Sequence, residues 1–259
     1  MPFWLRFRAP LARAIGLDLT HSQTRYGEEL DRVLKPGTRW LDLGCGHQII
    51  PDFLYPPEKQ RRWVDSARRF VGADTDAGLL AHPLLRLRVK ALGGTLPFRA
   101  GSFDVVTANM VAEHLPDPRA VLEDVRRVLA PGGRFTFQTP NYLYYLIWIA
   151  SWTPERLKKW LILRLEHRPA EDVFPAYYRM NTARRVHELA REAGFRVERL
   201  EVVGAGGSFL FLGPIGLAEL FVLRALQTRP LRGLQSNLIV TLVRDERATP
   251  GALPAPAPR

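Results

Sequence analysis

The stretch WLDLGCGHQII, residues 40–50, decides the fold, because a short apolar run ends there in two glycines one residue apart. Such a run is typical of a buried strand followed by a tight turn. In a parallel sheet, a glycine turn of this kind lets the backbone approach a ligand closely and offers it backbone amides. Gly44 and Gly46 therefore mark a candidate binding site. Ile49 stands where a dinucleotide-binding turn has its third glycine, which disfavours a dinucleotide ligand.

Short apolar segments alternate with helix-length segments and predict an α/β fold built on parallel strands. The candidate strands are RWLDL at 39–43, FVGAD at 70–74, RVKAL at 88–92, FDVVTAN at 103–109, RFTFQTP at 134–140, FRVERLEVV at 195–203 and NLIVTLVR at 237–244. One helix is predicted to begin at Asp117 and Pro118, and another near Asn181 and Thr182. We expect the segment YPPEKQRRW, residues 55–63, to be a surface loop.

The composition restricts the partners and the compartment. The 259 residues carry a formal charge of +11, which favours an anionic membrane surface or nucleic acid, although solvated arginines of an ordinary protein would give the same value. Cys45 is the only cysteine, so an internal disulfide and a cysteine zinc cluster are excluded and a cytoplasmic location is expected. Arg6, Arg8 and Arg13 interrupt the apolar N-terminus, so we expect no export signal. The sequence contains no uninterrupted run of about 18 apolar residues, so we expect no membrane-spanning helix.

Four motifs, in this order, resemble the class I S-adenosylmethionine-dependent methyltransferases, specifically a methyltransferase type 11-like domain of a bacterial subgroup. They are LDLGCGHQ at 41–48, FVGADTD at 70–76, LPFRAGSFDVVTANMVAEHLPDP at 96–118 and VRRVLAPGGRFTFQTPN at 125–141. The resemblance implies a Rossmann-like methyltransferase fold, with a mostly parallel seven-stranded sheet flanked by helices. It also implies S-adenosyl-L-methionine as the cofactor that donates the methyl group, without a metal.

The change of pattern after Pro140 predicts an α-helical, apolar cap inserted after the fifth strand. The expected organisation is a helical lid at 1–35, a methyltransferase domain at 36–246 with insertions at about 141–180 and 205–230, and a tail at 247–259. This tail has nothing to bury and is expected to be disordered.

The resemblance assigns roles to residues at the strand ends. Asp42 would help to hold the amino group of the donor, above the turn formed by Gly44, Cys45 and Gly46. Asp74, followed by Thr75, would accept hydrogen bonds from the ribose hydroxyls, because a carboxylate is an acceptor only, whereas Asp76 suits a helix cap. Leu92 would contact adenine, and Asn109 would lie beside the methyl group. The implied donor-binding set is Asp42, Gly44, Cys45, Gly46, Asp74, Thr75, Leu92 and Asn109.

The acceptor side is predicted from residues after the fourth strand and in the insertion. His114, within the motif EHL, is the candidate general base, although His114 and Glu113 could instead support their loop. Candidate acceptor-binding residues are Glu113, Tyr177, Tyr178 and Arg179, together with His167, Glu171 and Asp172 of the insertion. His47 lies either beside the donor or in a structural role. Gln23, Arg25 and Tyr26 belong either to a lid over the donor or to an ordinary helix packed on the sheet.

The predicted activity is O-methylation of a small, glycan or lipid-linked acceptor. One alternative is an RNA methyltransferase, which the net charge favours. The sequence ANMVAEHL after the fourth strand lacks the Asn/Asp-Pro-Pro-aromatic signature of amino-group methylation, so a nucleic-acid partner is disfavoured. Another alternative is a catalytically inactive donor-binding regulator or scaffold. The apolar segments at 142–165 and 209–226 either enclose the acceptor site or lie on an anionic membrane, at its inner face.

Overall fold

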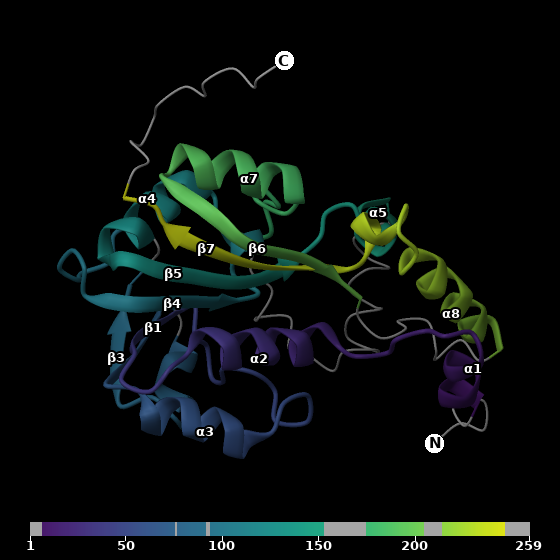
Figure 1. The fold of residues 1–259 in the computed structure, drawn as a ribbon, viewed down its shortest axis with the longest axis horizontal. Helices are drawn as coiled ribbons and strands as arrows, with labels where there is room; N and C mark the ends of the chain where they lie inside the picture. The colour runs from purple at the N-terminus through teal and green to yellow at the C-terminus, as the bar shows by residue number, and fades with distance from the viewer. Residues whose placement is uncertain (1–6, 76, 92–93, 153–174, 205–213, 247–259) are drawn as a thin grey trace.

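The computed structural model describes residues 7–75, 77–91, 94–152, 175–204 and 214–246. Its centre is one seven-stranded sheet in the order β3-β2-β1-β4-β5-β7-β6, in which β7 runs antiparallel to β5 and β6 (Figure 1). The strands are β1 Arg39–Leu43, β2 Arg69–Asp74, β3 Leu87–Lys90, β4 Phe103–Asn109, β5 Leu129–Pro140, β6 Phe195–Val203 and β7 Asn237–Arg244. The predicted mostly parallel α/β sheet is therefore confirmed.

Helices cover both faces of this sheet, with α4 and α7 on one side and α2 and α3 on the other (Figure 1). The α-helices are α1 Arg8–Ala14, α2 Ser22–Val33, α3 Pro57–Ser66, α4 Pro118–Val128, α5 Tyr145–Trp152, α7 Ala183–Glu192 and α8 Pro214–Leu226. Three short 3-10 helices are η2 Ala77–Ala81, η3 Ala112–His114 and η6 Arg232–Leu234.

Two hydrophobic cores form because successive strand residues point to opposite faces of the sheet. Leu41 and Val106 pack in the core that holds the apolar residues of α4 and α7. Their neighbours Trp40 and Val105 pack in the core that holds those of α2 and α3. The inner strands are thus buried on both faces, as parallel strands between two helical layers should be.

The predicted helix starts at Asp117 and Thr182 are confirmed by their side-chain caps. Asp117 Oδ1 accepts hydrogen bonds from the amides of Arg119 and Ala120, both at 3.1 Å. Thr182 Oγ1 accepts one from the amide of Arg185 at 3.2 Å. Both side chains satisfy amides that have no partner inside their helix.

The prediction of a surface loop at 55–63 was wrong, because α3 begins at Pro57. Proline fits the first turn of a helix, where its missing N–H removes no hydrogen bond. Gln60 and Trp63 form the buried side of α3, and Gln60 bonds both backbone groups of Ile50, with its Nε2 2.9 Å from the carbonyl oxygen and its Oε1 3.2 Å from the amide. Residues 44–56, between β1 and α3, form turns and irregular structure, so no helix follows the glycine turn directly.

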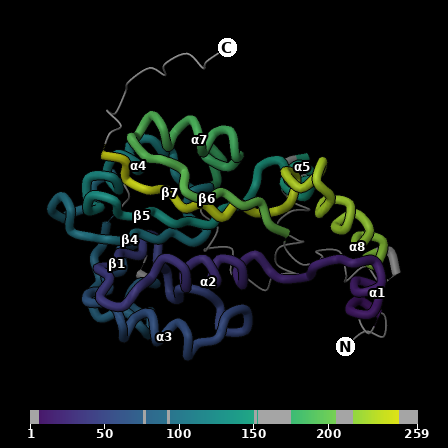
Figure 2. Tube along the Cα trace, in the orientation of Figure 1, coloured from purple at the N-terminus to yellow at the C-terminus, as the bar shows by residue number. Residues whose placement is uncertain are grey.

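A third apolar cluster joins α1, α5 and α8 at one end of the molecule, and we call these three helices the helical lobe. Figures 1 and 2 show it beyond the ends of the parallel strands, with the N-terminal α1 beside α8 from the other end of the chain. Arg224 Nε of α8 donates to the carbonyl of Ile15 at 2.8 Å. The buried members of the cluster are Ala12, Leu17, Tyr144, Leu220, Leu223 and Leu226.

The described parts of the predicted insertions contribute α5 and α8 to this lobe. The remainder of each insertion, the tail, Asp76, Leu92, His167, Glu171 and Asp172 lie outside the described residues. The predicted domain boundaries and the cap therefore stay predictions. In the part of the chain that the structure describes, the helices are too short or too polar to cross a membrane.

Candidate active site

The glycine turn lies at the carboxyl end of β1 and is tied to the end of β2. The amide of Gly44 donates to the carbonyl of Ala73 at 2.7 Å, and the amide of Gly46 donates to Asp74 Oδ2 at 2.8 Å. Both glycines have positive φ angles, 66° and 47°, in the region that other residues rarely adopt. Two predicted donor-binding elements, the turn and Asp74, are thereby brought together.

The two glycines differ in their surroundings. A Cβ atom at Gly44 would overlap Cγ2 of Val111, whereas one at Gly46 would find no atom within 4 Å. Gly44 is therefore required for packing against the segment after β4. Gly46 borders open space, which a ligand could use.

Asp42 lies beneath the turn and is 4% exposed. Its Oδ1 accepts a hydrogen bond from Thr107 Oγ1 at 2.5 Å. Thr107 Oγ1 in turn accepts a hydrogen bond from Trp40 Nε1 at 2.7 Å. Burial raises the pKa of Asp42 to about 7, and the negative charge of Asp74 adds to the effect. A cationic group beside Asp42 would reverse this and stabilise the carboxylate.

The other predicted donor residues differ in what they can contribute. The Cys45 side chain is 2% exposed and packs in the core beside α2 and α3, so only its backbone could face a ligand. Thr75 follows β2 directly and is half-buried. His47 is exposed, and its charge lowers the pKa of His82 only as a minor contribution beside burial.

Asn109, at the end of β4, connects three segments. Its amide group and that of Gln23 in α2 bond reciprocally, with N···O distances of 2.9 Å and 3.0 Å. Asn109 Nδ2 also donates to the carbonyl of Ile49 at 2.9 Å. The start of α2 is therefore fixed to the strand end and to the loop that follows the glycine turn. Tyr26, one helical turn further, is 1% exposed and packs on the sheet, whereas Arg25 pairs with Asp18 at the surface.

Met110 has a positive φ angle of 59° although it is not glycine. Its amide donates to the carbonyl of Gln138 at 2.9 Å, and its side chain is 37% exposed. Backbone strain of this kind is common at functional sites. The sequence offered no signal for Met110, because a φ angle cannot be read from a residue type that usually avoids it.

Glu113 is held in a buried network at the base of η3. Its carboxylate accepts from Thr139 Oγ1 at 2.9 Å, and Thr139 accepts from Asn181 Nδ2 at 2.7 Å. Its carbonyl accepts from the amides of Tyr177 and Tyr178, at 2.7 Å and 3.1 Å. Burial raises the pKa of Glu113. The Glu113 side chain is only 4% exposed. It is therefore better placed to support the neighbouring residues than to contact an acceptor.

His114 has a defined tautomer because its Nδ1 lies 2.9 Å from the carbonyl oxygen of Pro175. A carbonyl only accepts hydrogen bonds, so Nδ1 carries the hydrogen. In the neutral ring, Nε2 is then the basic nitrogen, and it lies 3.9 Å from Glu113 Oε1. This arrangement resembles the supporting contacts that orient catalytic histidines.

Aromatic residues lie next to this pair. Tyr178, with a φ angle of 52°, is half-buried, and burial together with the charge of Glu113 raises its pKa. Its ring centroid is 5.5 Å from that of Tyr142. Arg179 donates to the carbonyl of Pro116 and lies 5.7 Å from the ring centroid of Tyr177. The predicted acceptor-binding residues within the described ranges therefore cluster around η3.

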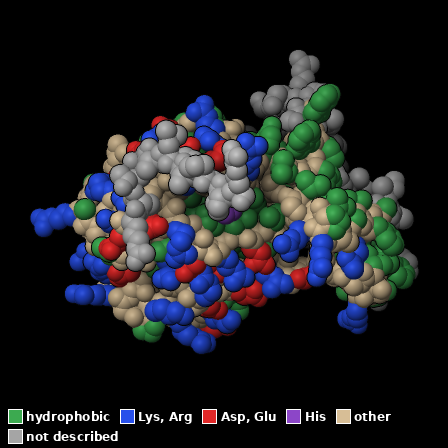
Figure 3. Space-filling view, turned by 45° about the horizontal axis from the view of Figure 1, so that its top comes forward, with side chains coloured by type: hydrophobic (Ala, Val, Ile, Leu, Met, Phe, Trp, Pro, Cys, Tyr) green, Lys and Arg blue, Asp and Glu red, His purple; other side chains and the backbone are tan. Residues whose placement is uncertain are grey.

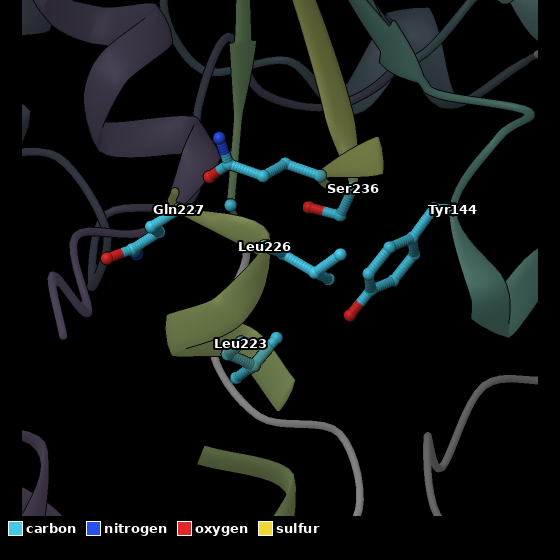
Figure 4. A pocket seen from close by; sticks show the side chains of 7 residues that line it. Tyr144, Leu223, Leu226, Gln227 and Ser236 are labelled. Carbon is cyan, nitrogen blue, oxygen red and sulfur yellow. The ribbon is translucent and has the colours of Figure 1, made fainter. Parts of the chain in front are cut away.

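A small cavity lies where the helical lobe meets the sheet (Figure 4). It measures about 10 Å³ and is lined by Tyr144, Leu223, Leu226, Gln227 and Ser236, among others. This volume suits about one water molecule. The cavity is therefore too small for an acceptor, and the candidate active site remains at the strand ends.

Most of this chain is similar in sequence to a known protein family. The family described as methyltransferase domain matches residues 19–200. A ubiquinone biosynthesis O-methyltransferase of Xanthomonas oryzae pv. oryzae (strain PXO99A) is 32% identical over 105 residues, which are 40% of this chain and 44% of that protein. The chain thus spans less than half of that relative.

Two further matches extend over more of the chain. A probable S-adenosylmethionine-dependent methyltransferase of Mycolicibacterium smegmatis is 32% identical over 164 residues, which are 61% of this chain and 52% of that protein. A solved methyltransferase of Haloferax volcanii, in complex with the Trm112 methyltransferase activator, has a TM-score of 0.58 at 20% identity. The two structures superpose over 96% of this chain and 100% of the other. At 20% identity, this similarity shows the fold alone.

Proposed function

This chain belongs to the methyltransferase domain family, and we propose that it is an S-adenosylmethionine-dependent methyltransferase that methylates an oxygen atom of a small, glycan or lipid-linked acceptor. The choice of oxygen is supported by the relatives that are O-methyltransferases. It is also supported by the basic nitrogen of His114, since a hydroxyl acceptor must lose a proton.

The glycine turn fits the donor because open space borders Gly46, where an added Cβ would meet no atom within 4 Å. The donor supplies a methyl group on a sulfonium. Asp42 would stabilise the ammonium of its methionine portion, which would in turn favour the ionised carboxylate. Asp74 would accept from the ribose diol, because a carboxylate offers about four acceptor positions and the amide of Gly46 takes one of them.

The single observation that carries the acceptor assignment is the 2.9 Å contact between His114 Nδ1 and the carbonyl oxygen of Pro175, from which we infer the tautomer of His114. With its hydrogen on Nδ1 and directed to Pro175, the ring presents Nε2 as the base. When the acceptor oxygen forms its bond to the methyl carbon, the carbon–sulfur bond would break and the donor would leave as a neutral thioether. Nε2 would take the hydroxyl proton, and the nearby Glu113 carboxyl would stabilise the resulting imidazolium. Positioning of the two reactants supplies most of the rate of such an in-line transfer.

His114→Ala tests this role. We expect kcat to fall by about 10²–10⁴-fold, with unchanged donor affinity. His187→Ala is the matched control, because His187 is exposed on α7, and its turnover should equal that of the wild type. Full turnover of His114→Ala would exclude the general-base role.

Two alternatives are separated by one labelling experiment. The charge of +11 favours an RNA acceptor, and a protein that only binds the donor would transfer no methyl group at all. The donor, labelled in its methyl group, is incubated with the protein and a lysate of the source organism, which is then separated into small-molecule, lipid, glycan, RNA and protein fractions. Label in the small-molecule, glycan or lipid fractions is expected. Label in RNA, or no transfer beside normal donor binding, would refute the proposal.

A further inference from the structure

The helical lobe is apolar on its outer surface as well as inside. In α8, the exposed positions Ala218, Phe221, Val222 and Ala225 follow the spacing i, i+3, i+4, i+7, and this spacing gives one continuous helix face. In a soluble protein, apolar residues at this spacing usually form the helix face that packs against the core. The outer surface of α8 is therefore without the polar residues that water would favour.

The second helix of the lobe adds large aromatic residues to this surface. In α5, the exposed fractions of Trp148, Ile149 and Trp152 are 53%, 50% and 85%, and that of Phe221 in α8 is 55%. Figure 3 shows hydrophobic side chains gathered over the end of the molecule that α5 and α8 form. We call these exposed residues of α5 and α8 the apolar surface. Apolar surface of this extent on a folded protein commonly marks a binding site.

Positive charges outnumber negative ones in the lobe and the segments beside it. The described segments 7–19, 141–152 and 214–236 contain two acidic residues. Glu219 is 6% exposed and accepts from Tyr145 Oη at 2.7 Å, and Asp18 pairs with Arg25 at 2.7 Å. The same segments contain five arginines: Arg8, Arg13, Arg224, Arg229 and Arg232. Arg13, Arg229 and Arg232 are exposed. The partner of this surface must therefore be apolar and anionic.

An anionic bilayer meets both requirements. Its hydrocarbon accepts aliphatic and aromatic side chains, tryptophan favours the headgroup level, and lipid phosphates attract arginine. A second copy of this chain meets only the first requirement, because a two-fold interface brings each surface against itself and would oppose arginine to arginine. Charge complementarity thus favours lipid over self-association.

A row of aromatic rings connects the apolar surface to the candidate active site. Trp148 Nε1 donates to the carbonyl of Tyr142 at 2.8 Å, and the two ring centroids are 6.4 Å apart. The Tyr142 ring is in turn 5.5 Å from that of Tyr178, whose amide bonds the carbonyl of Glu113. An acceptor held in a membrane could thus be led along aromatic surface toward His114.

We propose that the apolar surface of the helical lobe binds membranes that contain anionic phospholipid, and that the acceptor is drawn from this membrane. The second clause rests on the proposed function, whereas membrane binding does not. A binding failure and a catalytic failure are therefore separable by experiment.

The test is co-sedimentation of the full chain with vesicles at physiological ionic strength. The vesicles are phosphatidylcholine alone or phosphatidylcholine mixed with phosphatidylglycerol, and binding to the mixed vesicles is expected. Trp152→Ala with Phe221→Ala should weaken binding by about tenfold or more per residue. Arg229→Glu with Arg232→Glu should weaken it by about fivefold or more per residue, on mixed vesicles only.

Matched controls exclude a general effect of hydrophobicity or net charge. Leu87→Ala removes a 49% exposed apolar side chain from the start of β3, and Arg61→Glu with Arg62→Glu changes exposed charges of α3 equally. Both controls should bind vesicles as the wild type does. All variants should bind S-adenosylmethionine with unchanged affinity in calorimetry, which shows that they are folded.

Three results would overturn the proposal. The first is no binding of the wild type to mixed vesicles, and the second is equal binding by the variants and the controls. The third is a wild-type dimer that Trp152→Ala with Phe221→Ala dissociates, because the apolar surface would then belong to a second copy. Vesicle binding without label in lipid would instead overturn only the clause on the acceptor.

Discussion

Alanine at Gly44 and at Gly46 should have different effects, although the two residues stand one apart with similar backbone angles. Each φ angle is positive, and an alanine in this region costs about 1–2 kcal/mol. At Gly44 the new Cβ would also overlap Val111 Cγ2 and lie 3.2 Å from Cγ1, and overpacking of this kind costs about 1–3 kcal/mol more. We therefore expect Gly44→Ala to lower the free energy of unfolding by about 2–5 kcal/mol and Gly46→Ala by about 1–2 kcal/mol.

Urea denaturation of the two variants measures this difference. Val111→Ala, combined with Gly44→Ala, should restore the part that comes from overpacking, because it removes both methyl groups that the Cβ would meet. The same Val111→Ala change combined with Gly46→Ala should restore nothing. Equal losses in Gly44→Ala and Gly46→Ala, or no recovery with Val111→Ala, would refute the packing argument.

Donor binding should rank these variants in the opposite order. The Cβ of Gly46→Ala would project into the open space assigned to the donor, so calorimetry should find a greater loss of S-adenosylmethionine affinity than for Gly44→Ala with Val111→Ala. The reverse ranking would mean that the donor does not pass Gly46.

Further predictions concern the carboxylates and the start of α2. Asp74→Ala should weaken donor binding about 10–100-fold, the value of a charged hydrogen bond, and unchanged affinity in calorimetry would exclude its ribose role. Burial raises the pKa of Asp42 to about 7 from 3.8, so the folded protein keeps a proton that the unfolded chain loses, and the free energy of unfolding falls as pH rises between about 4 and 7. Asp42→Asn should remove this fall, of up to about 4 kcal/mol, in urea denaturation at several pH values, and an unaltered pH dependence would contradict the assignment. Gln23→Ala should lower the free energy of unfolding by about 1–3 kcal/mol, because it removes two hydrogen bonds with Asn109. The control Arg25→Ala removes only exposed ion pairs and should lower it by less than about 1 kcal/mol. Equal losses in urea denaturation would show that the Gln23–Asn109 contact contributes nothing.

The strands could be predicted because their signals are local. The apolar run at 39–43 ends at a glycine, and β1 has these bounds. The helix α3 was not predicted, and the reason is also physical: prolines are typical of turns, but Pro57 occupies the first turn of this helix. The buried Gln60, which bonds Ile50, gave no apolar periodicity from which a helix could be predicted.

The candidate site could be predicted only in part. Asp74 and Asn109 end their strands and Asp42 is the next-to-last residue of β1, and parallel strands bring such residues to one edge of the sheet. Contacts between distant segments leave no such pattern. The bond from Thr107 to Asp42 and the one between His114 and Pro175 join residues 65 and 61 positions apart, and neither has a signature in the sequence.

The placement of α2 on the sheet has a consequence for folding during synthesis. Glu29 of α2 accepts a hydrogen bond from Thr241 of β7, which is 212 positions later in the chain. At about 5–20 residues per second, the ribosome needs roughly 10–40 s to make the intervening chain. During that time the apolar side of α2, with Tyr26 and Leu30, has only part of its final cover. The nascent chain therefore keeps part of the apolar side of α2 exposed until β7 has been made.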